Sequence, residues 1–420
     1  MKIKTLKPIW ILFILAFLLR IAYGFIVYFY NPTAVFLPDS IGYAKIAENL
    51  YNHFAFSQSP DPSNLYPDSM RTPIYPGLLW LMYIFQITIP WLLIFQSFLG
   101  AHAVYLVYLI CKQFQFTEKV SLGAALLLAI NFNSIYFSSA VLTEILFQWL
   151  VLFSFYQFNT STKYGLLKSS LLMGIAFLTR PILTFLPLVL VGIKWFQKGL
   201  QKKMMIFLVV FMIFPSLWIL RNKLTFNNWM LSPVVELNFF YHLVPEIIPE
   251  EQMSEYLNQK EIAEKSQSTK KFVEVTRDYS RTKIKENLGQ AFLYVIQNPI
   301  KIVAFPIRSY IDYHFLENFS WNVDPSFINR IKNSHWVTKL LLVYQLIVSI
   351  ICLLGIAMSI KYFKRYWLIW TFFLYFILIS SISVPDPRFR IPAEPFMAIL
   401  ASIGIFNFLN EKKLKVTASQ

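Results

Sequence analysis

The sequence predicts an all-α integral membrane protein, on the evidence of its composition, its hydropathy and the placement of its charges. Hydrophobic residues make up 56% of the 420 residues and charged residues only 14%, whereas soluble domains carry about 25% charged residues. The mean hydropathy is +0.52. The formal net charge is +16, and Lys and Arg gather between apolar runs, as in the cytoplasmic loops of membrane proteins. We therefore read the basic excess as a topology signal and expect no nucleic-acid partner.

Apolar runs of about 17 to 25 residues are long enough to cross a bilayer as helices. The first run contains Arg20 and no small-residue cleavage site, so we expect a retained span rather than a removed signal peptide. On this criterion the sequence predicts about ten transmembrane helices, near residues 9–30, 91–111, 120–138, 142–158, 165–179, 182–197, 204–220, 338–360, 366–382 and 392–410.

The basic residues orient these spans. The N-terminus, the C-terminal tail and the turns that carry several Lys or Arg all fall on one side when the chain crosses ten times, and that side is the cytoplasm by the positive-inside rule. We expect a multi-pass protein of the plasma (bacterial inner) membrane with both ends inside. The two cysteines, Cys111 and Cys352, lie in or beside apolar runs and indicate neither a disulfide framework nor a zinc cluster.

This topology predicts three parts: an N-terminal transmembrane module (1–220) with a first outer loop (31–90), an outer-face helical segment (221–337) and C-terminal transmembrane helices (338–420). In the first outer loop, the stretch that begins LPDSIGYAKIAENL predicts an amphipathic helix on the membrane surface. Its apolar face comprises Tyr43, Ile46, Ala47, Leu50 and Phe54, and its polar face Lys45, Glu48, Asn49 and Asn52. The following RTPIYPGLLWLMYIF begins with prolines that suit a helix start. Its apolar run is too short to cross, so we expect a second horizontal or re-entrant helix.

Two acids and five arginines from separate outer loops are predicted to meet at one face of the membrane. Charged groups at membrane depth are costly and are usually functional. Each also has a structural reading: Asp39 as a helix N-cap, Glu144 as a favourable first-turn acid, and the arginines as side chains that reach for lipid headgroups. Arg20 lies within a span and needs an internal partner, for which Glu144 is a candidate. The outer-face set comprises Asp39, Glu144, Arg71, Arg180, Arg221, Arg388 and Arg390.

A lipid-linked sugar phosphate fits such a face. Arginine forks bind phosphate bidentately, and a carboxylate can take the proton of an attacking hydroxyl. The leaving group is then a polyprenyl phosphate, whose developing charge the arginines stabilise. Tyrosines supply either interface anchors or sugar-stacking faces, and we add Tyr43 and Tyr75 to the substrate-binding set. A transporter or flippase of lipid-linked glycans, or a ligase or polymerase of such glycans, also fits a multi-span chain with a basic outer site.

In the order of these motifs, the chain resembles the GT-C type multi-span glycosyltransferases, in particular the bacterial group related to protein O-mannosyltransferases and lipid A aminoarabinose transferases. The matching pieces are LPDSIGYAKIAENL, RTPIYPGLLWLMYIF, VLTEILF, LTRPILTFLPL, LWILRNKLTFNNWMLSP and RFRIPAEPFMAIL.

The resemblance implies inverting transfer of a sugar from a polyprenyl-phosphate donor to a hydroxyl of a glycan, lipid or protein acceptor on the extracytoplasmic face. In it, Asp39 matches the catalytic carboxylate, Glu144 a second acid, and Arg71, Arg180, Arg388 and Arg390 look like donor-phosphate contacts. Ser40 replaces the second acid of an Asp-Glu pair, so no divalent metal or other cofactor is indicated. Arg71-Thr72-Pro73 stands where the aminoarabinose enzymes have Lys-Pro-Pro, so their sugar is not carried over.

Overall fold

Every regular element in the part of the chain that the structure describes is a helix, which confirms the all-α prediction. The computed structural model describes residues 7–199, 201–265, 269–304, 336–382 and 386–417. The membrane-type bundle contains α1 (Pro8–Tyr30), α4 (Ile89–Gln113), α5 (Glu118–Ala129), α6 (Phe132–Ser138), α7 (Glu144–Phe158), α8 (Gly165–Phe177), α9 (Leu186–Lys198), α10 (Lys202–Phe226), α18 (Trp336–Ser359), α19 (Trp367–Ser381) and α20 (Glu394–Thr417).

Each predicted span coincides with a helix or a helix pair, but not all of these helices are long enough to cross a membrane. Among the described residues, five helices meet the length and hydropathy required: Pro8–Tyr30, Ile89–Gln113, Lys202–Phe226, Trp336–Tyr362 and Pro387–Leu409. A sixth crossing results if α5 and α6, which meet at a 50° bend, are counted as one broken span. The helices at the other four predicted spans have 13 to 15 residues, or about 20 to 23 Å, against a hydrocarbon core of about 30 Å. The count of ten crossings therefore stays a prediction.

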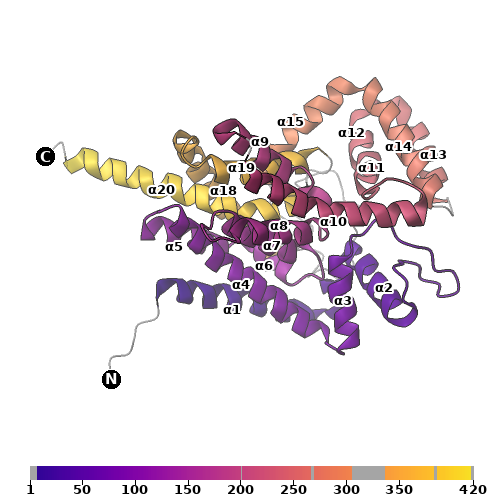
Figure 1. Ribbon diagram of the computed structural model, residues 1–420, viewed down its shortest axis with the longest axis horizontal. Coiled ribbons are helices and arrows are strands. Elements are labelled where there is room, and N and C mark those ends of the chain that lie inside the picture. Colours follow the sequence, from indigo (N-terminus) through magenta and orange to yellow (C-terminus); the bar gives the residue numbers. More distant parts are fainter. Residues whose placement is uncertain (1–6, 200, 266–268, 305–335, 383–385, 418–420) are drawn as a thin grey trace.

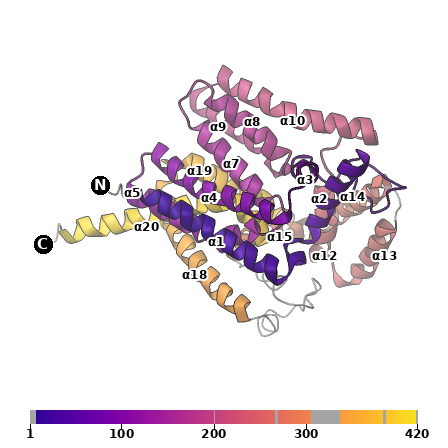
Figure 2. The same cartoon turned by 90° about the horizontal axis from the view of Figure 1, so that it is seen from below.

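The bundle presents a different set of helices at each end. α1 begins and α20 ends at the left of Figure 1, while the helices between the spans lie at the right. These are α2 (Pro38–His53) and α3 (Ile74–Ile84) below, and α11 (Val234–Asn238), α12 (Val244–Ile247), α13 (Met253–Glu264), α14 (Thr269–Glu286) and α15 (Leu288–Ala304) above. Figure 2 shows α8, α9 and α10 on one flank of α7, with α18 on the opposite side of the molecule. Of the predicted outer segment 221–337, residues 305–335 lie outside the described residues.

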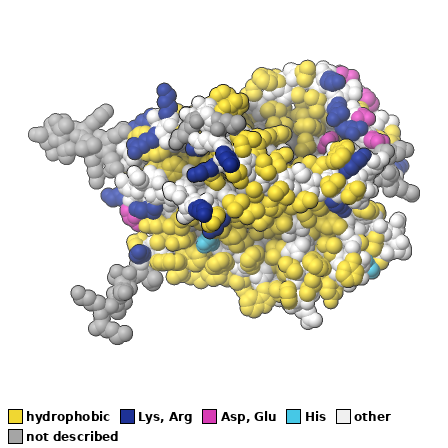
Figure 3. All heavy atoms as spheres, viewed as in Figure 1, with side chains coloured by type: hydrophobic (Ala, Val, Ile, Leu, Met, Phe, Trp, Pro, Cys, Tyr) yellow, Lys and Arg dark blue, Asp and Glu magenta, His cyan; other side chains and the backbone are white. Residues whose placement is uncertain are grey.

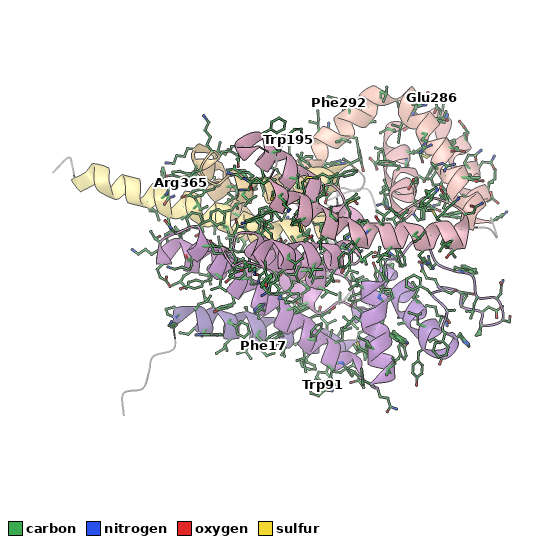
Figure 4. All side chains as sticks on the ribbon, viewed as in Figure 1. Phe17, Trp91, Trp195, Glu286, Phe292 and Arg365 are labelled. Carbon is green, nitrogen blue, oxygen red and sulfur yellow. The ribbon has the colours of Figure 1, made fainter. Side chains whose placement is uncertain are left out.

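The surface has the pattern expected of a membrane-embedded chain. In Figure 3 hydrophobic side chains cover the middle of the face shown, while Lys and Arg gather at the left end and both charge signs lie at the upper right over α13 and α14. Figure 4 shows Trp91 of α4 and Phe292 of α15 pointing outward, and their exposed fractions are 63% and 65%. Large exposed apolar patches are rare on soluble monomers and mark contact with lipid or a partner.

Arg20 does not pair with Glu144, contrary to the partner suggested from the sequence. Its buried guanidinium donates to the carbonyl oxygens of Ala16 (3.0 Å), Leu128 (3.2 Å) and Ala129 (3.2 Å). The last carbonyls of a helix have no partner within it, and the bend after Ala129 leaves those of α5 inside the bundle. Arg20 therefore donates hydrogen bonds to backbone carbonyl oxygens at the helix break rather than pairing with a carboxylate.

The amphipathic helix predicted after the first span is α2, with two differences in its faces. Tyr43, Ile46 and Ala47 are buried as expected, whereas Phe54, which follows the last helical residue, is 88% exposed. Asn49, expected on the polar face, is also buried and donates to the carbonyl oxygens of Ser57 (2.8 Å) and Ser59 (3.0 Å). The buried amide thus anchors the loop of residues 54–73, which carries Arg71, against α2.

Candidate functional site

Asp39 lies in the first turn of α2 but does not cap it. Leu37 is the N-cap residue and Pro38 the first helical residue, so Asp39 follows one position later. The capping contact comes from Ser40, whose hydroxyl accepts from the Leu37 N–H at 3.0 Å. Pro38 suits the first helical position because its missing N–H would be unpaired there in any case. The sequence reading of Asp39 as the cap is therefore wrong, and its carboxylate is left for contacts outside the helix.

Both carboxylate oxygens of Asp39 are engaged by arginines from distant segments. Arg71 Nη2 donates to Oδ1 at 2.8 Å, and Arg388 Nη1 donates to Oδ2 at 2.7 Å. Burial alone would raise the pKa of Asp39, but the Arg388 and Arg71 guanidiniums outweigh it and hold the pKa of this carboxyl well below its usual range. About a third of the side chain (34%) stays exposed. Asp39 is thus an ionised carboxylate that remains partly accessible at the end of the bundle where α2 lies.

Glu144, the first residue of α7, is the buried counterpart of Asp39. Its side chain is 1% exposed, and its Oε1 accepts from Arg180 Nη1 and from Arg388 Nε. Arg180 Nη1 also donates to the hydroxyl of Thr143 at 3.1 Å. Position at a helix N-terminus stabilises an acid, so the first-turn reading of Glu144 is confirmed, and the two guanidiniums supply the remaining compensation that a buried charge requires.

Arg388 joins the two acids into one network. Its Nε donates to Glu144 while its Nη1 donates to Asp39, so a single guanidinium spans the gap between α2 and α7. Arg388 belongs to the turn of helix η6 (Pro387–Ala393), which is shaped by the Asp386 carboxylate accepting from the Arg388 N–H at 2.7 Å. The structure therefore brings together five of the predicted residues: Asp39, Glu144, Arg71, Arg180 and Arg388.

Arg71 is positioned by its own loop and by an aromatic ring. The Asp68 carboxylate accepts from the Arg71 N–H at 2.8 Å, and burial raises the pKa of Asp68 despite the hydrogen bonds it accepts. The Arg71 guanidinium lies 4.8 Å from the centroid of the Tyr43 ring, in the range of a cation–π contact. The Tyr43 ring in turn packs edge-on against Tyr75 at 5.3 Å. Tyr43 therefore borders the charged network, while Tyr75 lies one layer deeper, donating to Gln96 Oε1 at 3.0 Å.

A small pocket opens beside Glu144, with a volume of about 10 Å³, room for about one water molecule. Its polar lining is Glu144, Arg180 and Arg388, and its apolar lining consists of Phe147, Ile182, Phe389 and Pro392. The Phe389 ring centroid lies 5.4 Å from the Arg180 guanidinium carbon and 5.9 Å from that of Arg388. Phe389 was not predicted from the sequence, where its only signal is its place between Arg388 and Arg390. The pocket combines cations with an apolar wall, and it has to widen before it can admit a phosphate group.

The remaining two predicted arginines have their contacts elsewhere. Arg221 lies within α10, which continues to Phe226. It donates to the Asp68 carbonyl oxygen at 2.6 Å, and aromatic rings that include Trp218 lie about 5 Å from it. Arg390 is 4% exposed, pairs with Glu394 at 3.2 Å and donates to the carbonyl oxygen of Val303 in α15 at 2.8 Å. These contacts tie α10 to the first outer loop and α15 to η6.

The charged groups of the network bear on the ligand it can hold. Three guanidiniums and two carboxylates form its ion pairs, and the buried acid Asp68 adjoins Arg71. Guanidinium groups clustered in this way are suited to bind a phosphate. The two acids are occupied by guanidiniums, and within the described residues no group of three or more His, Cys, Asp or Glu is arranged to hold a metal ion.

Comparison of the chain with protein-family models and with curated proteins found no match to either.

Proposed function

We propose that this chain is a membrane glycosyltransferase that moves a sugar from a polyprenyl-phosphate donor to an acceptor hydroxyl at the outer face of the membrane. The proposal rests above all on one observation: Arg71, Arg180 and Arg388 converge from three separate segments on Asp39 and Glu144, beside a pocket with an apolar wall. Guanidinium groups clustered in this way are suited to bind the single negative charge of a phosphodiester. The apolar lining of the pocket suits a lipid-linked phosphate better than a soluble one.

The chemistry follows from the difference between the two acids. Asp39 is accessible and takes the proton of the acceptor hydroxyl while that oxygen attacks the anomeric carbon. The bond from the anomeric carbon to the phosphate oxygen breaks on the opposite side, and polyprenyl phosphate leaves with its electron pair. Arg180 and Arg388 stabilise the charge that develops on the leaving oxygen. Glu144 is sealed beneath them and holds their guanidiniums in place.

The experiment that tests the proposal measures donor consumption by purified protein in nanodiscs. A panel of polyprenyl-phosphate sugars is offered with candidate acceptor hydroxyls, and release of polyprenyl phosphate is followed. We expect the wild type to consume one of the donors, and Asp39→Asn to release at most a hundredth as much while folding normally. General base catalysis contributes about 10²- to 10⁴-fold.

A matched control is Asp278→Asn, because Asp278 is an exposed acid in the outer helices, paired with Arg277 at 3.1 Å. It should leave donor consumption unchanged. Near-normal turnover by Asp39→Asn would remove Asp39 from the chemistry. No consumption of any donor by folded wild type would refute the transferase proposal.

One feature favours a transporter of lipid-linked glycans as a second candidate. Broken helices at a buried site are typical of transporters, and the bend between α5 and α6 lies within the bundle beside buried polar groups such as Asn133 and Glu394. Transport would move the intact donor between leaflets and release no polyprenyl phosphate. A flip assay on the same vesicles therefore separates the two candidates.

A further inference from the structure

The contacts of Asp39 oppose the role proposed for it. Each of its oxygens already accepts a hydrogen bond from a guanidinium, at 2.8 Å from Arg71 and 2.7 Å from Arg388. Two adjacent cations stabilise the ionised carboxylate, and a carboxylate so stabilised has little affinity for the proton of a hydroxyl. In the arrangement seen here Asp39 is therefore a poor base.

A phosphate would compete with Asp39 for the same two arginines. Guanidinium donors bind phosphate oxygens in the same geometry as carboxylate oxygens, so Asp39 and the donor phosphate seek the same partners. Arg71 reaches Asp39 from the first outer loop and Arg388 from η6. Arg388 is also held by Glu144, so it can turn from Asp39 to a phosphate at the mouth of the pocket while keeping its buried partner.

Once the guanidiniums turn away, the remaining surroundings of Asp39 favour the protonated form. Burial is the largest influence on this carboxyl and acts to raise its pKa. The other ionisable groups of the network are Glu144, Asp68, Tyr43 and Arg180, and the Arg180 guanidinium pairs with Glu144 rather than with Asp39. The arriving phosphate adds a further negative charge. The proton affinity of Asp39 thus depends on whether the donor is present.

We propose that the donor phosphate draws Arg71 and Arg388 away from Asp39, so that Asp39 becomes an effective base only in the donor complex and the substrates add in order, donor first. This inference rests on the proposed function and adds to it a rule for when the base is active. Arg388 is in this scheme a positioning residue for Asp39 as well as a phosphate contact.

The test is proton uptake on donor binding. A polyprenyl-phosphate sugar is titrated into the full-length protein near pH 5.5, without acceptor, by calorimetry in two buffers of different ionisation enthalpy. The probe is a phosphodiester, since a monoester phosphate itself titrates near pH 6. If donor binding raises the pKa of Asp39 to about 2 above its ordinary value of about 4, as burial of a carboxyl can, each donor bound takes up about 0.7 of a proton at pH 5.5.

Two variants make the result specific. Asp39→Asn should bind the donor with the uptake abolished, and the matched control Asp278→Asn should retain it. Arg71→Gln removes one of the two guanidiniums in advance, so Asp39 is partly protonated before the donor arrives and the uptake should fall. With an acceptor identified, a non-reacting acceptor analogue should inhibit uncompetitively against donor in the wild type, as donor-first binding requires.

The possible outcomes distinguish failure of this inference from failure of the proposed function. Donor binding and transfer without proton uptake, or with uptake unchanged in Asp39→Asn, overturn the inference and leave the transferase proposal intact. Competitive inhibition of donor binding by the acceptor analogue overturns the binding order. Failure of folded wild type to bind any donor refutes the proposed function and this inference with it.

Discussion

The substitution Glu144→Gln tests whether the buried acid is the counter-ion that holds the site together. Its carboxylate is 1% exposed and accepts from Arg180 and Arg388, which are 17% and 11% exposed. Removing one member of a buried ion pair costs about 3 to 5 kcal/mol, because the partner is left charged and uncompensated. Glutamine keeps an acceptor oxygen, and Arg388 keeps Asp39 as a partner. We therefore expect the lower end, about 3 kcal/mol.

In a thermal scan of the detergent-solubilised protein this cost should appear as a fall in Tm of about 3 to 6 °C. A change of 1 kcal/mol shifts Tm by about 2 to 4 °C in domains of 150 to 250 residues, and by less in longer chains. Scans of all variants are run at one rate, because thermal unfolding of large proteins is often irreversible and depends on scan rate.

The matched control for this scan is Glu118→Gln. Glu118 pairs with Lys112 at 3.1 Å, but the two side chains are 51% and 43% exposed, and exposed pairs contribute about 0 to 1 kcal/mol. Its Tm should move by no more than about 1 °C. Equal shifts in the two variants, or a Glu144→Gln protein more stable than the wild type, would refute the view of Glu144 as an essential buried counter-ion.

Two further predictions concern stability. Because the pKa of Asp39 is held below its unfolded value of about 4, its contribution is complete above that pH and is lost as the pH falls toward the folded pKa; the Tm difference between wild type and Asp39→Asn should shrink below about pH 4, and a constant difference would contradict this. Gly404 of α20 and Gly355 of α18 lie where the two helices meet, and a Cβ on Gly404 would overlap the Gly355 backbone. Gly404→Ala should therefore lower Tm by several degrees, whereas Gly77→Ala should not, because the space around Gly77 is open.

The elements of the fold were predictable because hydropathy is a local property of the chain. Each apolar run became a helix or a helix pair, and the position of Asp39 after the first span followed directly. The break between α5 and α6 was not predicted, although Asn131 marks it within the run near 120–138: its side chain caps α6 by accepting from the Ser134 N–H at 3.0 Å. The carbonyl oxygens at the end of α5 are satisfied from outside the helix, by Arg20. A backbone acceptor freed by tertiary structure leaves no mark in the sequence.

The site was predictable as a set of charges but not as a set of pairs. Arg221 and Arg388 both follow the end of an apolar run at the predicted outer face, so the sequence gives no reason to prefer one. The structure separates them by their partners: Arg388 reaches Asp39 and Glu144, while Arg221 lies among aromatic rings and donates to the Asp68 carbonyl oxygen. An arginine side chain is long and can pair with any nearby carboxylate, so tertiary packing decides which partner it takes.

The exposure of the two acids bears on the choice between transfer and transport. A transport cycle requires the bound group to be reached from each side of the membrane in turn. Here Asp39 is 34% exposed and Glu144 1%, although one guanidinium joins them. An accessible acid joined by one arginine to a sealed acid matches the proposed transfer, in which both substrates reach Asp39 from one end of the bundle and Glu144 keeps the shared arginine in place. A transport cycle would in addition need a second conformation in which the site opens toward the other end.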